Sequence, residues 1–304
     1  MLMDASLGGS GLVIPNVNCY NWQEKKGCIF AAYHKPFQLL SVPFIVPVQA
    51  GSRCCVIRKE GSLSKGDEEW FCVNTISDGT GDNISERNHE FSECTVLYWV
   101  WKNIDVDKLD YVGMFQYRRQ LILNDFFNEA PNNSEKEVYR CVHFSKDDVN
   151  IAEKVGLDEN IIRELLKKYD VIIPFSSQLD KMGVESSYED WVCKIPGVHI
   201  GDLVELENVF TNLHPEDSKA FHSYLSGSSK LMYQLFITTP TIFKDYCQWL
   251  FEILFEVDKK LDTTLYSVNG RRTLGYLAEI LYGFYFTKLK TDHRVLECGV
   301  TYLE

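Results

Sequence analysis

The sequence predicts an α/β protein with a central, mostly parallel sheet flanked by helices. From Cys28 onward, short apolar runs alternate with helix-like segments of ten or more residues, a pattern typical of strands joined by helical crossovers. Of the 304 residues, 45% are hydrophobic, enough for the core of one large domain over residues 27–304. Residues 1–26 include LGGSG and are expected to form a loose leader.

Hydrophobic periodicity predicts the individual elements. The strand candidates are residues 28–33, 43–48, 70–76, 111–116, 170–174, 232–238 and about 294–303. The helix candidates are residues 91–101, 239–261 and 273–289, where apolar side chains recur at helical spacing. The polar stretches at about 124–150 and 176–230 are predicted to be long irregular insertions, which in compact domains usually serve function.

Charge and cysteine usage exclude several classes of protein. The net charge of −12 argues against nucleic-acid binding, which usually requires a basic face. None of the ten cysteines forms a C-x-x-C pair, so we expect reduced thiols rather than a zinc site. No apolar stretch reaches the ~18 residues that span a bilayer, and no signal peptide is recognisable, so we expect a cytoplasmic protein.

The segment YVGMFQYRR is an apolar strand that ends abruptly in Gln116, Tyr117, Arg118 and Arg119. Adjacent arginines at the end of a buried strand are unfavourable unless an anion neutralises them. A guanidinium can bind two phosphate oxygens at once. The alternative is a pair of surface salt bridges.

Two earlier segments also place polar residues where strands end. His34 and Lys35 follow the first strand, at the sheet edge where ligands bind in open α/β folds. Asp78, Asp82 and Ser85 lie in a glycine-containing segment that leads into a helix, and Ser85 is a candidate helix cap. Solvated or purely structural turns explain both segments equally well.

Near the C-terminus, Arg271 and Arg272 precede Glu279 by two helical turns, with Gly275 between them. Glycine would allow the helix to approach a neighbour closely. Glu279 borders an apolar face, where a carboxyl group can become a general base with a raised pKa. A helix-surface ion pair is the competing explanation.

Seven motifs occur in an order that resembles one bacterial family. They are H-K-P at 34–36, P-V-Q-A-G at 47–51, GDNISERN at 81–88, ECTVLYWVWKN at 93–103, YRR at 117–119, YCQWLFEILF at 246–255 and RTLGYLAE at 272–279. The family is known as domain of unknown function 4422 and occurs in capsular and exopolysaccharide gene clusters. The similarity extends over about residues 28–303.

The resemblance implies a single-domain, GT-A-like glycosyltransferase. It would transfer galactose or galactofuranose from a UDP-sugar to a polysaccharide or lipid-linked glycan, as in capsule or O-antigen biosynthesis. A lipid-linked acceptor would bring the protein to the inner face of the membrane as a peripheral protein. The resemblance leaves open whether the protein uses a divalent metal ion, Mn or Mg, as a cofactor. The D-x-D pair Asp105 and Asp107 precedes its strand, whereas a metal-binding pair should follow it.

The resemblance also implies roles for individual residues. Arg118 or Arg119, assisted by Lys35 and Arg272, would neutralise the leaving diphosphate. The catalytic candidates are Asp82, Glu93 and Glu279. The substrate-binding candidates are His34, Lys35, Asp78, Asn83, Ser85, Asn88, Gln116, Tyr117, Arg118, Arg119 and Arg272.

Three positions depart from the family pattern. Gln116 replaces a histidine, Tyr233-Gln234 replaces Tyr-Asn, and Ile280 stands where arginine is common. Glutamine can donate and accept hydrogen bonds as histidine does, but its side chain cannot take up or release a proton. The alternative function is therefore a catalytically weakened relative that binds a glycan or a partner protein. A nucleoside triphosphate-dependent transferase is disfavoured because no P-loop is present.

Overall fold

The computed structural model describes residues 26–304 except 41, 55–62, 146–147 and 149, so nearly all of the expected leader lies outside the described residues. A seven-stranded sheet forms its centre, in the order β10-β6-β9-β4-β1-β2-β3. Its strands are β1 (Gly27–Tyr33), β2 (Ile45–Gln49), β3 (Ile76–Ser77), β4 (Tyr111–Gln116), β6 (Val171–Pro174), β9 (Phe236–Thr238) and β10 (Val295–Cys298). Only β9 runs antiparallel to its neighbours, which confirms the mostly parallel sheet.

Two small sheets and a set of helices surround this centre. The small sheets pair β5 (Cys141–Phe144) with β11 (Val300–Leu303), and β7 (Ser177–Gln178) with β8 (Ser229–Lys230). The helices are α1 (Lys65–Asn74), α2 (Asn88–Phe91), α3 (Cys94–Asn103), α4 (Phe126–Glu129), α5 (Ile151–Lys154), α6 (Glu159–Lys168), α7 (Ser187–Lys194), α8 (Ile200–Leu213), α9 (Ser218–Ser226), α10 (Pro240–Asp258) and α11 (Thr273–Leu289).

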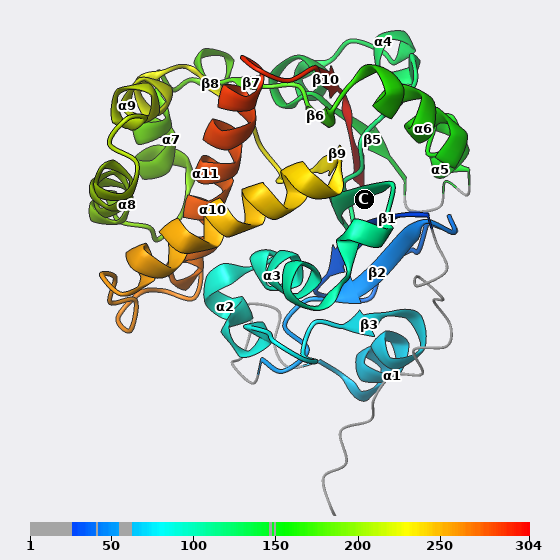
Figure 1. The fold of residues 1–304 in the computed structure, drawn as a ribbon, viewed down its shortest axis with the longest axis horizontal. Helices are drawn as coiled ribbons and strands as arrows, with labels where there is room; N and C mark the ends of the chain where they lie inside the picture. Colours follow the sequence, from blue (N-terminus) through cyan, green and yellow to red (C-terminus); the bar gives the residue numbers. More distant parts are fainter. Residues whose placement is uncertain (1–25, 41, 55–62, 146–147, 149) are drawn as a thin grey trace, which may run out of the picture.

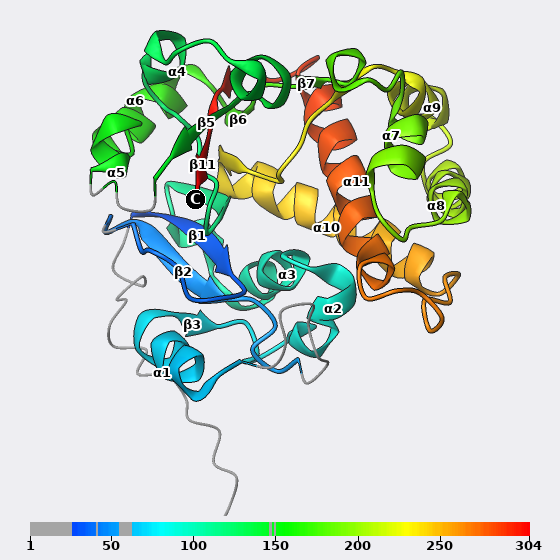
Figure 2. The ribbon, with the colours of Figure 1, turned by 180° about the vertical axis from the view of Figure 1, so that it is seen from behind.

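Strand β1 shows how the sheet separates two cores. Cys28 and Phe30 point into the core beneath α3, α10 and α11, whereas Ile29 and Tyr33 point into the core on the opposite face. This follows from the two-residue repeat of a strand. Figure 1 shows α10 and α11 side by side, with α7, α8 and α9 beyond them, and Figure 2 shows the same layers from behind.

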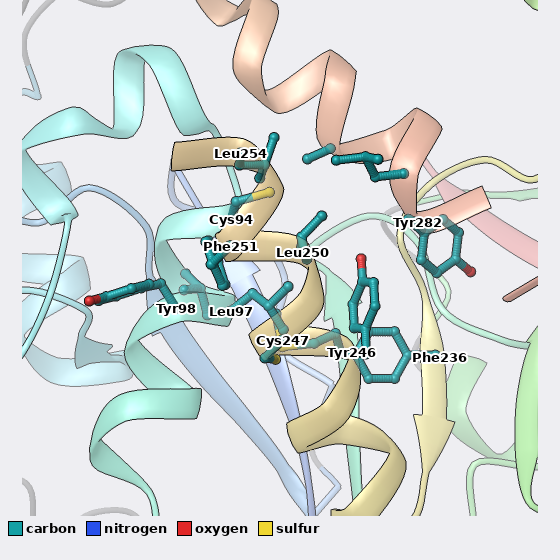
Figure 3. Close-up of a cluster of buried hydrophobic side chains, with 14 of the residues drawn as sticks. Cys94, Leu97, Tyr98, Phe236, Tyr246, Cys247, Leu250, Phe251, Leu254 and Tyr282 are labelled. Atoms are coloured by element: carbon teal, nitrogen blue, oxygen red, sulfur yellow. The ribbon is translucent and has the colours of Figure 1, made fainter. Parts of the chain in front are cut away.

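Helix α10 is the centre of the larger core. Thr239 caps it by accepting a hydrogen bond from the Ile242 amide, and Pro240 occupies its first turn, so the predicted start is confirmed. Figure 3 shows side chains of α10 meeting those of α3, β9 and α11. Tyr98 and Phe251 contact edge to face with their centroids 5.0 Å apart. This packing fixes α3 and α11, which carry candidate site residues at their N-terminal ends.

The predicted strand at residues 70–76 is wrong, because most of it belongs to helix α1. The Ser64 hydroxyl accepts from the Asp67 amide while the Asp67 carboxylate accepts from the Ser64 amide, a reciprocal cap that starts the helix. Only Phe71 of this helix is buried. Strand-favouring residue types suggested β structure, but the cap decided the conformation.

Two further predictions differ from the structure. The strand expected over 232–238 begins only at Phe236, because Tyr233 and Gln234 adopt left-handed φ angles of 77° and 48°. The segment 176–230, expected to be irregular, contains α7, α8 and α9. Its buried aromatic residues are Trp191, Phe210 and Phe221. Exposed apolar residues such as Val192 and Val204, together with the buried carboxylates Asp190 and Asp202, blur the one-sided apolar pattern that would have predicted these helices.

Candidate functional site

A cavity of about 650 Å³ opens where β1 and β4 end. One wall comes from residues that follow these strands, including His34 and the segment 116–119. Other lining residues come from the start of α3, from α7 with its following loop, and from residues 268–279. A pocket of this size at the carboxyl ends of parallel strands is the usual ligand position in an open α/β sheet.

The chain reverses direction directly after β4. The Gln116 amide donates to the Arg119 carbonyl at 3.2 Å, and the Arg119 amide donates to the Gln116 carbonyl at 3.0 Å. The Tyr117 amide donates to the carbonyl of Ala32 in β1 at 3.0 Å. This tight turn brings the side chains of Gln116 and Arg119 together at the cavity wall.

Arg118 and Arg119 line the cavity without carboxylate partners among the described residues. The Arg118 guanidinium lies 5.1 Å from the ring centroid of Tyr302, and that of Arg119 lies 4.8 Å from that of Tyr233. Each Nε atom is buried and has no hydrogen-bond partner in the described structure. Aromatic faces therefore support both cations while most of their donors stay available to an anion.

Gln116 joins two of the candidate residues. Its Nε2 donates to Glu93 Oε1 at 2.8 Å and to the Tyr233 carbonyl at 2.9 Å. Its Oε1 accepts from Nη1 of Arg119 at 3.1 Å. A single neutral amide thus fixes a carboxylate and a guanidinium in the same wall.

A second pair of arginines lines the same cavity from the segment directly before α11. Nε of Arg272 donates to the Ser92 hydroxyl at 3.0 Å, and Nη2 of Arg271 donates to the Thr264 carbonyl at 3.2 Å. Neither forms an ion pair with a described carboxylate. Gly275 makes this approach possible, as expected, since a Cβ there would lie 2.7 Å from the Ser92 hydroxyl oxygen.

Four of the five described arginines outside the cavity form ion pairs, and Arg140 is the exception. Arg87 pairs with Glu90 and Asp258, and other paired arginines are Arg53, Arg163 and Arg294. All four arginines that line the cavity lack such partners within the described structure. In a chain of net charge −12, these four arginines without ion-pair partners make an anion the kind of ligand that this cavity favours.

Glu279 projects from α11 into the same cavity, with 27% of its side chain exposed. Oε2 accepts from the Tyr233 amide at 3.1 Å, and Oε1 lies 4.0 Å from Nζ of Lys230. Loss of solvent raises the pKa of Glu279, and the charge of Lys230 partly opposes that shift.

Two of the four described non-glycine residues with a positive φ angle line this cavity. Ser92 and Tyr233, which both line it, adopt φ angles of 51° and 77°. Non-glycine residues rarely adopt these angles, and such strain commonly occurs at functional sites.

The structure brings most of the predicted site residues together. Those that line the cavity are His34, Asn88, Glu93, Gln116, Tyr117, Arg118, Arg119, Arg272 and Glu279. Those outside its lining are Lys35, Asp78, Asp82, Asn83 and Ser85.

Asp78 is fully buried, and protein donors surround both of its carboxylate oxygens. Oδ2 accepts from the Gly51 amide and the Thr95 hydroxyl, each at 2.7 Å. Oδ1 accepts from the amide and hydroxyl of Ser52, each at 2.9 Å, and from the Ser85 hydroxyl at 2.5 Å. Asp78 therefore ties the loop after β2 to α3, and Ser85 serves this network instead of the predicted helix cap.

Asp82 and Asn83 have local partners. Asp82 accepts from the Tyr98 hydroxyl at 3.1 Å, and its amide donates to Asn103 at 3.0 Å. The Asn83 side chain bonds the Gly81 carbonyl and the Ser85 amide. Both residues shape the loop between β3 and α2.

Lys230 and Asp190 also line the cavity, although neither was predicted as a site residue. They form an ion pair of 2.7 Å, and each side chain is 4% exposed. Lys230 follows two serines and precedes Leu231 in a segment expected to be irregular, so no local pattern marks it.

Within the described residues, no three His, Cys, Asp or Glu side chains come together as a metal site. Of the helices that the structure describes, none is both long and apolar enough to cross a membrane.

Fold and site together define an α/β protein with a cationic ligand cavity at the edge of its sheet. The chain belongs to the family described as Domain of unknown function (DUF4422), whose profile matches residues 28–291. It is also similar to the apo structure of WbbM, a bifunctional glycosyltransferase, with a TM-score of 0.79 and 26% sequence identity.

That similarity covers 92% of this chain and 46% of the WbbM chain, so this chain spans less than half of that protein's length. No curated protein matches the sequence. The predicted α/β architecture is confirmed, and it matches a glycosyltransferase fold.

Proposed function

We propose that this protein is a glycosyltransferase that transfers galactose or galactofuranose from a UDP-sugar to a polysaccharide or lipid-linked glycan. The likeness to a glycosyltransferase supports the reaction class. The main support is the cavity itself, where Arg118, Arg119, Arg271 and Arg272 converge without carboxylate partners among the described residues. A nucleotide diphosphate supplies the charge that such a site lacks.

In this reaction the bond between the anomeric carbon and the diphosphate oxygen breaks, and negative charge builds up on the departing UDP. Arg118 and Arg119 would neutralise that charge from the wall formed by the turn after β4. Gln116 would hold Arg119 in place through its 3.1 Å hydrogen bond, so little reorganisation is needed as charge develops.

The acceptor hydroxyl must lose a proton as it attacks the anomeric carbon. Glu279 is our candidate for the general base, because it faces the cavity and burial raises its pKa. Glu93, fixed by Gln116, would bind sugar hydroxyls or stabilise positive charge on the donor ring.

A UDP-release assay with UDP-galactose, UDP-galactofuranose and UDP-glucose, each with glycan acceptors, tests this function. We expect release from a galactosyl donor, and loss of that release in the Arg118→Ala/Arg119→Ala variant. A protein that binds UDP but cleaves none of these donors would instead be a binding relative. Repeating the assay with EDTA tests metal dependence. Complete loss restored by Mn would show that the arginines do not act alone.

A further inference from the structure

Lys230 is a buried lysine placed between two carboxylates at the cavity wall. The residue is 3% exposed, and Asp190 is equally buried. Nζ lies 2.7 Å from Asp190 Oδ2 and 4.0 Å from Glu279 Oε1. Lysine is almost never fully buried unless it is paired, so this arrangement calls for a specific reason.

Three separate elements create this arrangement. Lys230 ends the two-residue strand β8, which pairs with β7, while Asp190 lies in α7 and Glu279 in α11. From the loop after β8, the Tyr233 amide donates to the second oxygen of Glu279 at 3.1 Å. The two oxygens of Glu279 therefore face two different positive partners, which restricts the rotation of the carboxylate.

We propose that Lys230, anchored by Asp190, is a positioning residue that orients Glu279 and keeps it in the proton-accepting form. This inference rests on the proposed function, in which Glu279 activates the acceptor hydroxyl. Asp190 supplies the compensating charge, because a lone lysine at this depth would tend to lose its proton.

Charges from every neighbouring element act on Glu279. Burial raises its pKa, Lys230 and the Tyr233 amide lower it, Glu93 raises it, and Arg119 lowers it. Four uncharged groups also interact electrostatically with it, from α3, α9, the loop after β8 and α11 itself: Cys94, Tyr224, Tyr233 and Tyr282. Burial raises the pKa of each of these four groups, so they stay neutral near pH 7. Lys230 is then the strongest group that favours the ionised carboxylate.

Infrared titration of the carboxyl band tests the inference without relying on turnover. Glu279→Gln identifies the band by its disappearance. In Lys230→Met/Asp190→Asn we expect the Glu279 midpoint to rise by about one pH unit or more. The matched control, Lys288→Met/Asp217→Asn, removes an exposed ion pair and should leave the midpoint unchanged. An unchanged midpoint in the Lys230 variant would overturn the proposal.

A second variant covers the case in which the double variant does not fold. Lys230→Gln removes the positive charge but keeps a hydrogen-bond donor for Asp190, and the same upward shift is expected. A midpoint at the wild-type value in Lys230→Gln would equally refute the role of the lysine charge.

The pH profile of kcat/KM separates this inference from the proposed function. Glu279 can act as a base only above its titration midpoint. In the Lys230 variants, the acidic limb of the kcat/KM profile should therefore shift to higher pH together with the infrared midpoint. A purely structural ion pair would lower stability and leave the limb in place, which contradicts the proposal. A wild-type protein that cleaves no donor would refute the proposed function, while the infrared titration would still decide whether Lys230 controls Glu279.

Discussion

Two polar segments at the same edge of the sheet use their charges in opposite ways. Asp78 is fully buried, and its oxygens accept hydrogen bonds from five protein donors. Arg118 and Arg119 lie partly open to the cavity, and their Nε atoms have no partner in the described structure. A charged group whose hydrogen-bonding positions are filled by the protein stabilises the fold. A charged group with unfilled positions can bind a ligand.

The difference is not visible in the sequence, where both segments are polar residues that follow a strand. It depends on how many complementary groups the fold brings near each charge. Substitutions in the two segments should therefore separate stability from ligand affinity.

The largest expected effect is the loss of stability in Asp78→Ala. The substitution leaves several buried donors without an acceptor, so the free energy of unfolding should fall by about 3 kcal/mol or more. Urea unfolding measures this change. Asp82→Ala, in the same loop but exposed, is the control and should change stability by less than about 1 kcal/mol. Equal effects of the two substitutions would refute the structural role of Asp78.

Arg119→Ala should show the reverse pattern. Removing one charge-assisted contact to the diphosphate should weaken UDP binding by about 2 kcal/mol, or roughly 30-fold, with little change in stability. Isothermal titration calorimetry and thermal unfolding provide the two values. A variant that unfolds more easily but binds UDP normally would place Arg119 with the structural residues.

Arg87→Ala is the matched arginine outside the cavity. Arg87 forms two hydrogen bonds of 2.6 Å to Asp258 and one of 2.6 Å to Glu90, and its side chain is 37% exposed. Solvent screens such pairs, so we expect a stability loss of about 1 kcal/mol and unchanged UDP affinity. Weakened UDP binding here would mean that arginine loss acts through overall charge rather than position.

The smallest effect is expected from Gln116→His, which restores the residue typical of the family. The imidazole cannot reproduce all three hydrogen bonds of Gln116, so UDP affinity should change by less than about fivefold. Turnover should become pH-dependent between pH 5 and 8, where histidine titrates. If only the histidine variant turned over, the natural protein would be the weakened relative considered above.

The sequence predicted the elements whose local signals agree with their packing. Strands β1 and β4 are continuous apolar runs, and α10 begins at a Thr-Pro cap that the structure confirms. The failures at residues 70–76 and 176–230 have physical causes. In the first, a capping box overrode strand propensity. In the second, exposed valines and buried aspartates blurred the apolar periodicity of the helices.

Residues that line the cavity could be selected from the sequence where a single segment brings them together. The arginine pair after β4 and Glu279 could be selected because each stands beside an apolar segment. Lys230 could not, because its partner Asp190 lies 40 residues away and the two meet only after α7 and β8 have packed. Asp78 was selected as a substrate-binding residue, but its carboxylate is surrounded by protein donors. A polar motif in a sequence does not reveal which donors will surround it in the fold.

Comparing the affinities of UDP and uridine tests the central claim most directly. If the cavity arginines bind the diphosphate, the wild-type protein will prefer UDP strongly, and Arg118→Ala/Arg119→Ala will lose most of that preference while binding uridine as before. A double variant that still prefers UDP over uridine as strongly as the wild type would contradict the account.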